Sequence, residues 1–338
     1  MLGSPWFLWS NPDMDLGNAL RVSRFWLRAR CRGDLELSDF SGSLLRGVFG
    51  AALRDLVCIT GASHCDGCAL RSRCSYAVWM ETPAPDRSHL LPPGAASPHP
   101  WLLEPPQGAL RISAGAHLEM RFLLFGRAHA QLGLCLLAFR RALAQGLGAS
   151  RVALDLDGIR REDETDWSPV ERYVPPQASP IVVPTTIRNV TLELRSPLRI
   201  LRQGKVLPPD RLQFVDFFSA LQRRLGLLEA FHEDAPSPDW DYRLALEAAR
   251  SCTWKVEDAK WVCRERYSYR QERPMKWTGV VGKYHIANLP DILWPVLYRG
   301  QWIHVGKNTT FGFGEYQIVP SNFTNIHAAP KFLHHTPV

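Results

Sequence analysis

Residues whose types and spacing could do chemistry gather near the C-terminus, in the stretch His304-Val-Gly-Lys-Asn-Thr-Thr-Phe-Gly-Phe-Gly-Glu-Tyr. Its glycines, Gly306, Gly312 and Gly314, permit positive φ angles and lack the Cβ atoms that would keep a ligand's backbone at a distance. Lys307 adds a positive charge beside them. A loop of this kind suits the phosphates of a ligand backbone.

The glycine spacing argues against two common nucleotide sites. The Walker pattern GxxxxGK[ST] is absent, and so is a GxGxxG that opens a helix after a strand. We therefore expect a polynucleotide rather than a hydrolysed nucleotide or a dinucleotide. His304 could then exchange a proton with the ligand while Lys307 stabilises charge on a phosphate. On a regular strand these two side chains face opposite sides, so the pairing requires a turn between them.

A second group of reactive residues is the set of four cysteines within 17 residues, Cys58-x6-Cys65-x2-Cys68-x5-Cys74. Four thiolates are the number that a closed tetrahedral zinc site needs. An iron–sulfur cluster is an alternative, because thiolates hold both kinds of metal, and unrelated buried cysteines are the simplest one. We expect structural zinc that holds this segment together and takes no part in a reaction.

Basic and aromatic side chains alternate between Trp261 and Trp277. At strand spacing Arg266 and Arg270 share one face, and the tyrosines beside them occupy the other. The combination fits phosphate contact with base stacking. The alternative is an ordinary strand with one solvated face and one aromatic face in the core.

Length and charge are consistent with these sites. The 338 residues suffice for two domains, each with its own core. The net charge of +7 is uneven, because residues 1–175 carry +1 and residues 176–338 carry +6. The basic half contains the glycine-rich loop, and this coincidence favours nucleic acid as a partner.

Neither a secretory signal nor a membrane segment is recognisable. The N-terminus lacks a basic start followed by a sustained apolar core and a cleavage site. The most apolar later run, residues 132–147, is interrupted by Arg140 and Arg141 and is too short to span a bilayer. These features predict a cytoplasmic protein that makes no membrane contact.

Hydrophobic periodicity predicts the elements that must position these residues. In the first half it predicts strands at 20–32, 76–81, 117–126 and 151–159, and helices at 44–57 and 128–146. In the second half it predicts strands at 189–201, 315–319 and twice or more within 254–283, and helices at 210–231 and 289–299. Each half thus has the order β-α-β-β-α-β. The predicted fold class is α+β, with two ferredoxin-like (RRM-like) domains in tandem.

The domain boundaries follow from prolines and cysteines. We expect an N-terminal domain over residues 1–166 with a cysteine-rich insertion at about 58–108, and a C-terminal domain over 187–319. Residues 167–186 contain five prolines, which interrupt regular structure and predict a linker. Residues 320–338 are expected to form a flexible tail.

Three motifs make this sequence similar to a known family, the CRISPR precursor-crRNA processing endoribonucleases of the RAMP superfamily. Residues Ser43 to Cys58 resemble that family's first helix, and Cys65 to Tyr76 resemble the cysteine insertion of one branch. Residues from Arg266 to Gly314 resemble its C-terminal block. The resemblance implies two ferredoxin-like folds, recognition of CRISPR repeat RNA, and one metal-independent cut. In that cut a 2′-hydroxyl attacks the adjacent phosphate and leaves a cyclic phosphate.

The resemblance also implies roles for particular residues. His304 and Lys307 become the catalytic candidates, with His64, His89, His117 and His285 as other candidates for the histidine. The expected RNA-binding residues are Arg46, Arg54, Arg266, Arg270, Lys283, Gly306, Thr309, Gly312, Phe313 and Gly314.

The sequence departs from the family in its first helix. Many members carry the catalytic histidine in or just after that helix, whereas residues 41–59 contain none. The departure favours an alternative, a non-catalytic crRNA-binding subunit of a CRISPR effector complex, with other Cas effector subunits as candidate partners. A third reading is a metal-binding interaction module unrelated to RNA.

Overall fold

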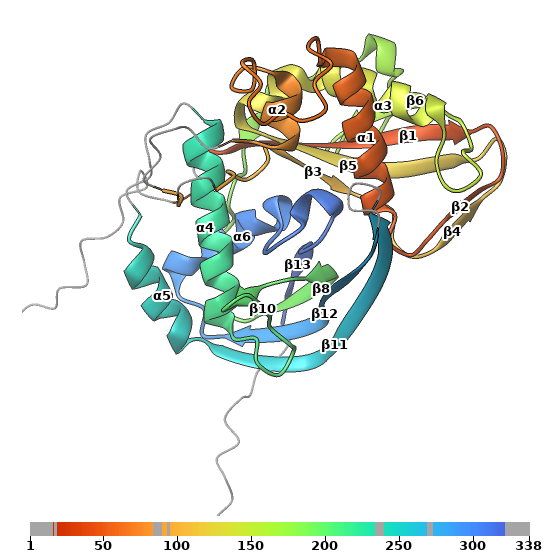
Figure 1. Cartoon of the computed structure of the whole chain (residues 1–338). Coiled ribbons are helices and arrows are strands. Elements are labelled where there is room, and N and C mark those ends of the chain that lie inside the picture. Colours follow the sequence, from red (N-terminus) through yellow and green to blue (C-terminus); the bar gives the residue numbers. More distant parts are fainter. Residues whose placement is uncertain are drawn as a thin grey trace, which may run out of the picture.

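The computed structural model describes residues 16, 19–83, 90–92, 95–233, 240–268 and 273–321, with the backbone alone at 264–268 and 273–276. Two antiparallel sheets lie one above the other with helices between them and above them (Figure 1). Among the described helices, none is long and apolar enough to cross a membrane.

The N-terminal domain has ferredoxin-like topology. Its main elements are β1 (Arg21–Cys31), α1 (Gly42–Val57), β3 (Trp101–Glu104), β5 (His117–Phe125), α3 (Leu132–Gln145) and β6 (Leu154–Arg161). The sheet order is β3-β5-β1-β6, which is the order expected when β-α-β-β-α-β units pack both helices on one face. Alternate residues of β1, such as Phe25 and Leu27, are buried in one hydrophobic cluster with Phe49 of α1 and Phe139 of α3.

The C-terminal domain repeats this topology. Its elements are β8 (Val190–Leu198), α4 (Phe214–His232), α5 (Tyr242–Ser251), β11 (Thr253–Ser268), β12 (Arg273–Ala287), α6 (Trp294–Ile303) and β13 (Tyr316–Pro320). Its sheet order, β11-β12-β8-β13, is equivalent to that of the first sheet. The tandem arrangement predicted from the sequence is therefore present, with α5 as an additional helix that the periodicity did not indicate.

Short elements complete the chain. The strands are β2 (Leu35–Leu37), β4 (Leu110–Ile112), β7 (Ser179–Pro180), β9 (Leu201–Arg202) and β10 (Lys205–Val206). The helices are α2 (Ser75–Met80) and four 3-10 turns, η2 (Gly126–Gln131), η3 (Val170–Arg172), η4 (Asp291–Leu293) and η5 (Thr309–Phe311).

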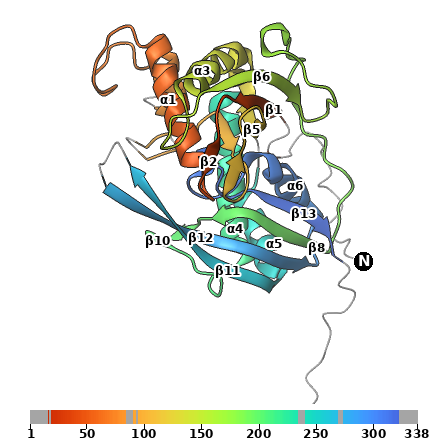
Figure 2. The ribbon, with the colours of Figure 1, turned by 90° about the vertical axis from the view of Figure 1, so that its right-hand side faces the viewer.

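The two domains share a hydrophobic core. Helix α6 lies between the two sheets, as the two views agree (Figures 1 and 2). One buried cluster contains Leu123 and Phe125 of the N-terminal sheet together with Leu221 of α4 and Leu297 of α6. The first sheet is thus covered on both faces, by α1 and α3 on one and by the C-terminal domain on the other.

The predicted strand at 76–81 is wrong, because these residues form helix α2. The second strand of the domain is β3, which lies within the range predicted as the insertion. All of β3 is buried, with Leu102 in the interdomain cluster and Leu103 in the N-terminal one. A strand covered on both faces has no alternation for a sequence pattern to detect. The predicted linker is also partly structured, since β7 pairs with β1.

Candidate nucleic-acid interface

The glycine-rich loop follows α6 and is held by close backbone contacts. Gly306, Gly312 and Gly314 all have positive φ angles, of 86°, 88° and 74°. A Cβ atom on Gly306 would collide with the Arg199 carbonyl, and one on Gly312 would collide with Pro105 of the N-terminal domain. The glycines therefore allow close approach of the protein's own chain. Their predicted contact with an RNA backbone stays a prediction.

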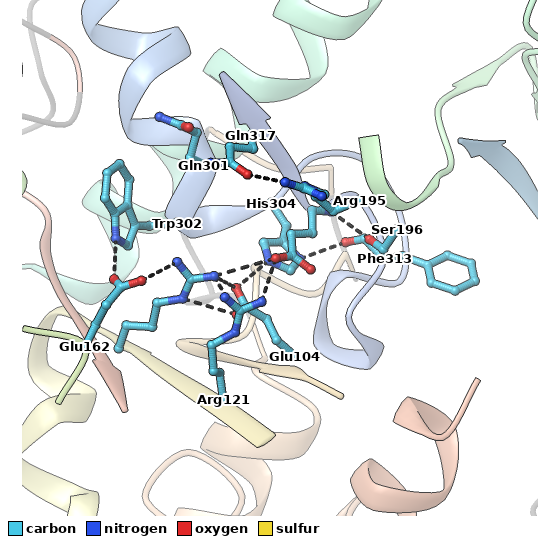
Figure 3. A network of polar contacts seen from close by, with 12 residues as sticks. Glu104, Arg121, Glu162, Arg195, Ser196, Gln301, Trp302, His304, Phe313 and Gln317 are labelled. Carbon is cyan, nitrogen blue, oxygen red and sulfur yellow. Dashed lines mark hydrogen bonds and ion pairs between the residues drawn. The ribbon is translucent and has the colours of Figure 1, made fainter. Parts of the chain in front are cut away.

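His304, at the start of this loop, is completely buried. Its Nδ1 lies 3.0 Å from the Phe313 carbonyl oxygen and its Nε2 lies 2.9 Å from Glu104 Oε1 (Figure 3). A carbonyl and an ionised carboxylate can only accept, so both ring nitrogens donate. A histidine with both nitrogens engaged and no exposed surface cannot take a proton from RNA while this arrangement holds. The structure does not support the catalytic role predicted for His304.

His304 belongs to an ionic network that joins the two domains (Figure 3). Glu104 of β3, with no exposed side-chain surface, also binds Arg24 of β1 at 2.6 Å and pairs with Arg121 of β5. Arg121 in turn reaches Glu315, beyond the loop, at 2.7 Å. Burial alone would raise the pKa of Glu104, but the hydrogen bond from His304 and the charges of Arg24 and Arg121 hold it well below its usual range.

Arg46 is the predicted RNA-binding residue of the first helix that the structure brings to the glycine-rich loop. Its Nε donates to Thr310 Oγ1 at 3.2 Å, and its guanidinium lies 4.6 Å from the centre of the Phe311 ring. Arg54, two turns further along α1, donates instead to the Ala62 carbonyl in the cysteine segment. The two arginines are thus separated, and only Arg46 contacts the loop directly.

The other predicted RNA-binding residues lie apart from one another. Lys283 is exposed on β12, where it pairs with Glu193 at 3.3 Å. Phe313 is buried and packs on Phe40 at a centroid distance of 4.7 Å, so its ring is not free to stack on a base. Arg266 is in β11 but its side chain is not described, and Arg270 lies outside the described residues, as does His89.

A cavity of about 750 Å³ opens between the two domains beside the glycine-rich loop. Its walls come from residues 91–92 and 95–99 before β3, from residues 199–202 after β8, from one side of α4, and from loop residues 306–310. The cavity therefore exists only when the domains are packed together. Its cationic lining residues are Arg199, Arg202, Arg223, Arg224 and Lys307.

The charges of this cavity favour an anion. Its acidic residue is Asp216, and this carboxylate pairs with Arg202 at the cavity wall. Lys307 is exposed. Its backbone N–H donates to the Arg199 carbonyl at 2.9 Å, which fixes the position of its backbone at the cavity wall. Thr309, also predicted from the sequence, lines the same cavity. The hydroxyl and amide groups that accompany it are those of Ser97, Ser219, Asn308 and Thr310.

Arg224 is the most strongly buried cation of this cavity. Its Nε donates to the Ile303 carbonyl at 2.7 Å, while its Nη2 is shielded from solvent and has no hydrogen-bond partner among the described residues. Burial lowers the pKa of Arg224 to about 9. A buried positive charge of this kind is costly on its own, and a nearby anion would stabilise it.

Sequence reasoning missed the arginines of this cavity. The signals were two short basic clusters, one around Arg199 and Arg202 and one at the adjacent pair Arg223 and Arg224. Each cluster alone reads as solvated surface. Only the packing of α4 beside the loop turns them toward a common cavity.

The four cysteines predicted to bind metal line one smaller cavity of about 260 Å³ together with His64. All are free thiols. A hydrogen bond with Thr60 lowers the pKa of the Cys58 thiol, whereas burial raises that of Cys65. As the described residues lie, no three His, Cys, Asp or Glu side chains are close enough to hold one metal ion. The residue types fit zinc, but their present spacing does not.

Each half of the chain matches a known protein family. Residues 192–316 match the family described as CRISPR-associated endoribonuclease Cas6, and residues 20–179 match one described as an N-terminal domain. No curated protein sequence matches.

Two solved structures share the fold. A Cas6 product complex aligns with a TM-score of 0.50 and 14% identity, covering 88% of this chain and 99% of that one. A chain of a partial Cas6-RT-Cas1–Cas2 complex aligns with a TM-score of 0.54 and 13% identity, covering 91% of this chain and 47% of that one. At such identities the likeness concerns the fold alone.

The ionic network leads to a prediction for Glu104→Gln. At neutral pH the variant should lose about 3–5 kcal/mol of unfolding free energy, because the buried negative charge that Arg24, Arg121 and His304 share is removed. The folded-state pKa of Glu104 is depressed, so its charge stabilises the fold above pH 4.5 and this contribution is lost as the pH falls below that value. Denaturant unfolding should show that the difference in unfolding free energy between wild type and variant becomes smaller in acid.

The matched control for this prediction is Asp155→Asn. Asp155 pairs with Arg32 at 2.6 Å, but both side chains are about half exposed or more. Its substitution should cost less than about 1 kcal/mol. If the loss of unfolding free energy in Glu104→Gln stays the same in acid, the Glu104 charge does not stabilise the network.

Proposed function

We propose that this chain binds CRISPR repeat RNA and cleaves precursor crRNA once per repeat. Support comes from residues 192–316, which match the family described as CRISPR-associated endoribonuclease Cas6. The cut is metal-independent: a 2′-hydroxyl attacks the adjacent phosphate and gives a cyclic phosphate. The product is the mature guide RNA.

The observation that carries this proposal is the cationic cavity between the domains. Five cations and a single paired carboxylate line it, whereas much of the remaining surface pairs its arginines with acids, as at Arg28 and Arg32. RNA backbones are bound mainly through phosphates. The cavity is large enough for a phosphate with its flanking riboses, and the guanidinium of Arg224 lies at its wall.

The cavity also supplies charge stabilisation for the cut. The attack places additional negative charge on the phosphate oxygens, and fixed cations are the groups that stabilise it best. Lys307, on a loop pinned by its glycines, and Arg224, held through its Nε, are the cations we assign to this task. The Arg224 guanidinium and the Lys307 backbone are held before RNA binds, so little reorganisation of the protein chain is needed during the reaction.

The second candidate function is a crRNA-binding subunit that does not cut. The absence of a histidine from residues 41–59 and the burial of His304 favour it. A structure of similar fold belongs to a Cas6-RT-Cas1–Cas2 complex, and other Cas proteins are the partners we propose under either function.

One assay separates the two functions. Labelled repeat RNA is incubated with the protein in EDTA and resolved on denaturing and native gels. A single product ending in a cyclic phosphate, absent when the ribose at the cut carries no 2′-hydroxyl, supports the nuclease. A shifted but intact RNA supports the subunit, and RNA affinity that is negligible at all salt concentrations contradicts both.

Lys307→Ala tests the cavity as the RNA site. Loss of one phosphate contact should weaken binding about tenfold for all RNA sequences and reduce the slope of log K against log salt by about 1. Fluorescence anisotropy over a salt series measures both. Arg111→Ala is the control, because Arg111 is 87% exposed and paired with Glu36 on a separate two-stranded sheet. Equal effects of the two substitutions would exclude a specific contact at Lys307.

For the cysteine segment we propose a structural zinc ion held by Cys58, Cys65, Cys68 and Cys74. Its support is the convergence of the four thiols on one cavity. Purified protein should contain one zinc per chain by mass spectrometry, and Cys68→Ser should lose the metal and lower the melting temperature. Cys263→Ser, at an exposed thiol outside this segment, should change neither. The proposal would be contradicted if the purified wild-type protein contained no zinc and Cys68→Ser melted at the same temperature as wild type.

A further inference from the structure

His99 is a histidine that the sequence patterns did not single out. It lies two positions before β3 and lines the same cavity as Arg224 and Lys307. Among the histidines of the described residues it is the one that lines this cavity. Those with other partners include His232, bonded to the Pro98 carbonyl, and His117, paired with Asp157.

A hydrogen bond fixes the tautomer of His99. Its Nδ1 lies 2.5 Å from Thr82 Oγ1, and that hydroxyl donates its single proton to the Val78 carbonyl at 2.9 Å. The hydroxyl must therefore accept from His99, so Nδ1 carries the proton and Nε2 keeps a lone pair. Fixing one nitrogen in this way leaves the other as a base of defined position.

The surroundings keep His99 neutral. Burial, followed by the charges of Arg46, Arg224 and His232, lowers the pKa of His99 to about 3. A phosphate bound in the cavity would offset these positive charges, and an opposite charge nearby raises the pKa of a histidine. RNA binding would thus make His99 a stronger base where the substrate lies.

We propose, on the basis of the function proposed above, that His99 is the general base of RNA cleavage. Nε2 takes the proton of the 2′-hydroxyl while the 2′ oxygen forms a bond to the adjacent phosphorus. The bond from phosphorus to the 5′ oxygen breaks, and that oxygen takes a proton from water. The products are a 2′,3′-cyclic phosphate and a 5′-hydroxyl, and His99 then returns its proton to solvent.

Single-turnover cleavage of repeat RNA by His99→Gln tests this proposal. The rate should fall by about 10²–10⁴-fold, the usual contribution of general acid–base catalysis, while the affinity for RNA stays within about threefold. Wild-type rates should rise with pH as His99 loses its proton in the complex, and the variant should lack this dependence. His129→Gln is the control and should match wild type, because His129 bonds Ser23 Oγ and lies outside this cavity.

Thr82→Val is the second variant, because it keeps His99 but removes the hydroxyl that orients His99 Nδ1, together with that hydroxyl's bond to the Val78 carbonyl. Its rate should fall about 10- to 100-fold, the usual cost of losing such an orienting partner, with RNA affinity retained. Its pH dependence should keep the wild-type shape because His99 is still present.

The outcomes separate this proposal from the one on which it rests. A wild-type rate in His99→Gln overturns the base assignment and leaves the nuclease intact. Parallel loss of affinity and cleavage in His99→Gln overturns it too, because His99 would then bind RNA rather than move a proton. Wild-type protein that binds RNA without cutting it overturns both the assignment of His99 as the base and the proposed nuclease function.

Discussion

The carboxylate of Glu104 lies where the two domains meet and has no access to water. Because its charge must be paired there, it constrains how the neighbouring side chains are arranged. An unpaired charge at such a position would cost many kcal/mol. Arg24 and Arg121 come from neighbouring strands of the same sheet, whereas His304 comes from the other domain. Pairing Glu104 with His304 therefore positions the glycine-rich loop on the N-terminal sheet, and the shared apolar core holds the remaining interface.

The cavity is a consequence of that packing. One end of β3 carries Glu104, and His99 precedes the other end of the same strand. The loop that His304 begins carries Lys307, and α4 contributes Arg224 from beside α6. Residues separated by up to two hundred positions thus face one cationic space. Because Arg224 is held through its Nε and Lys307 through its backbone N–H, an RNA phosphate would meet cations whose attachment points are already set.

Local patterns determined most of the fold and little of the site. Alternation in β1 and helical spacing in α1 were sufficient to predict these elements, and the element order then predicted both ferredoxin-like domains. Strand β3 was not predicted, because it is buried on both faces and its sequence does not alternate. The position of His304 before glycines predicted access to a ligand, whereas burial against Glu104 is a tertiary property. The convergence of Arg224 and His99 likewise depends on packing that no local spacing records.

The most direct test of the account is to crosslink repeat RNA containing 4-thiouridine to the wild-type protein and map the joined peptides by mass spectrometry. We predict crosslinks on both walls of the interdomain cavity, within residues 95–99 of one domain and within residues 199–202 or 306–310 of the other. Crosslinks confined to the cysteine segment, or to the sheet face that carries Lys283, would contradict an RNA site between the domains.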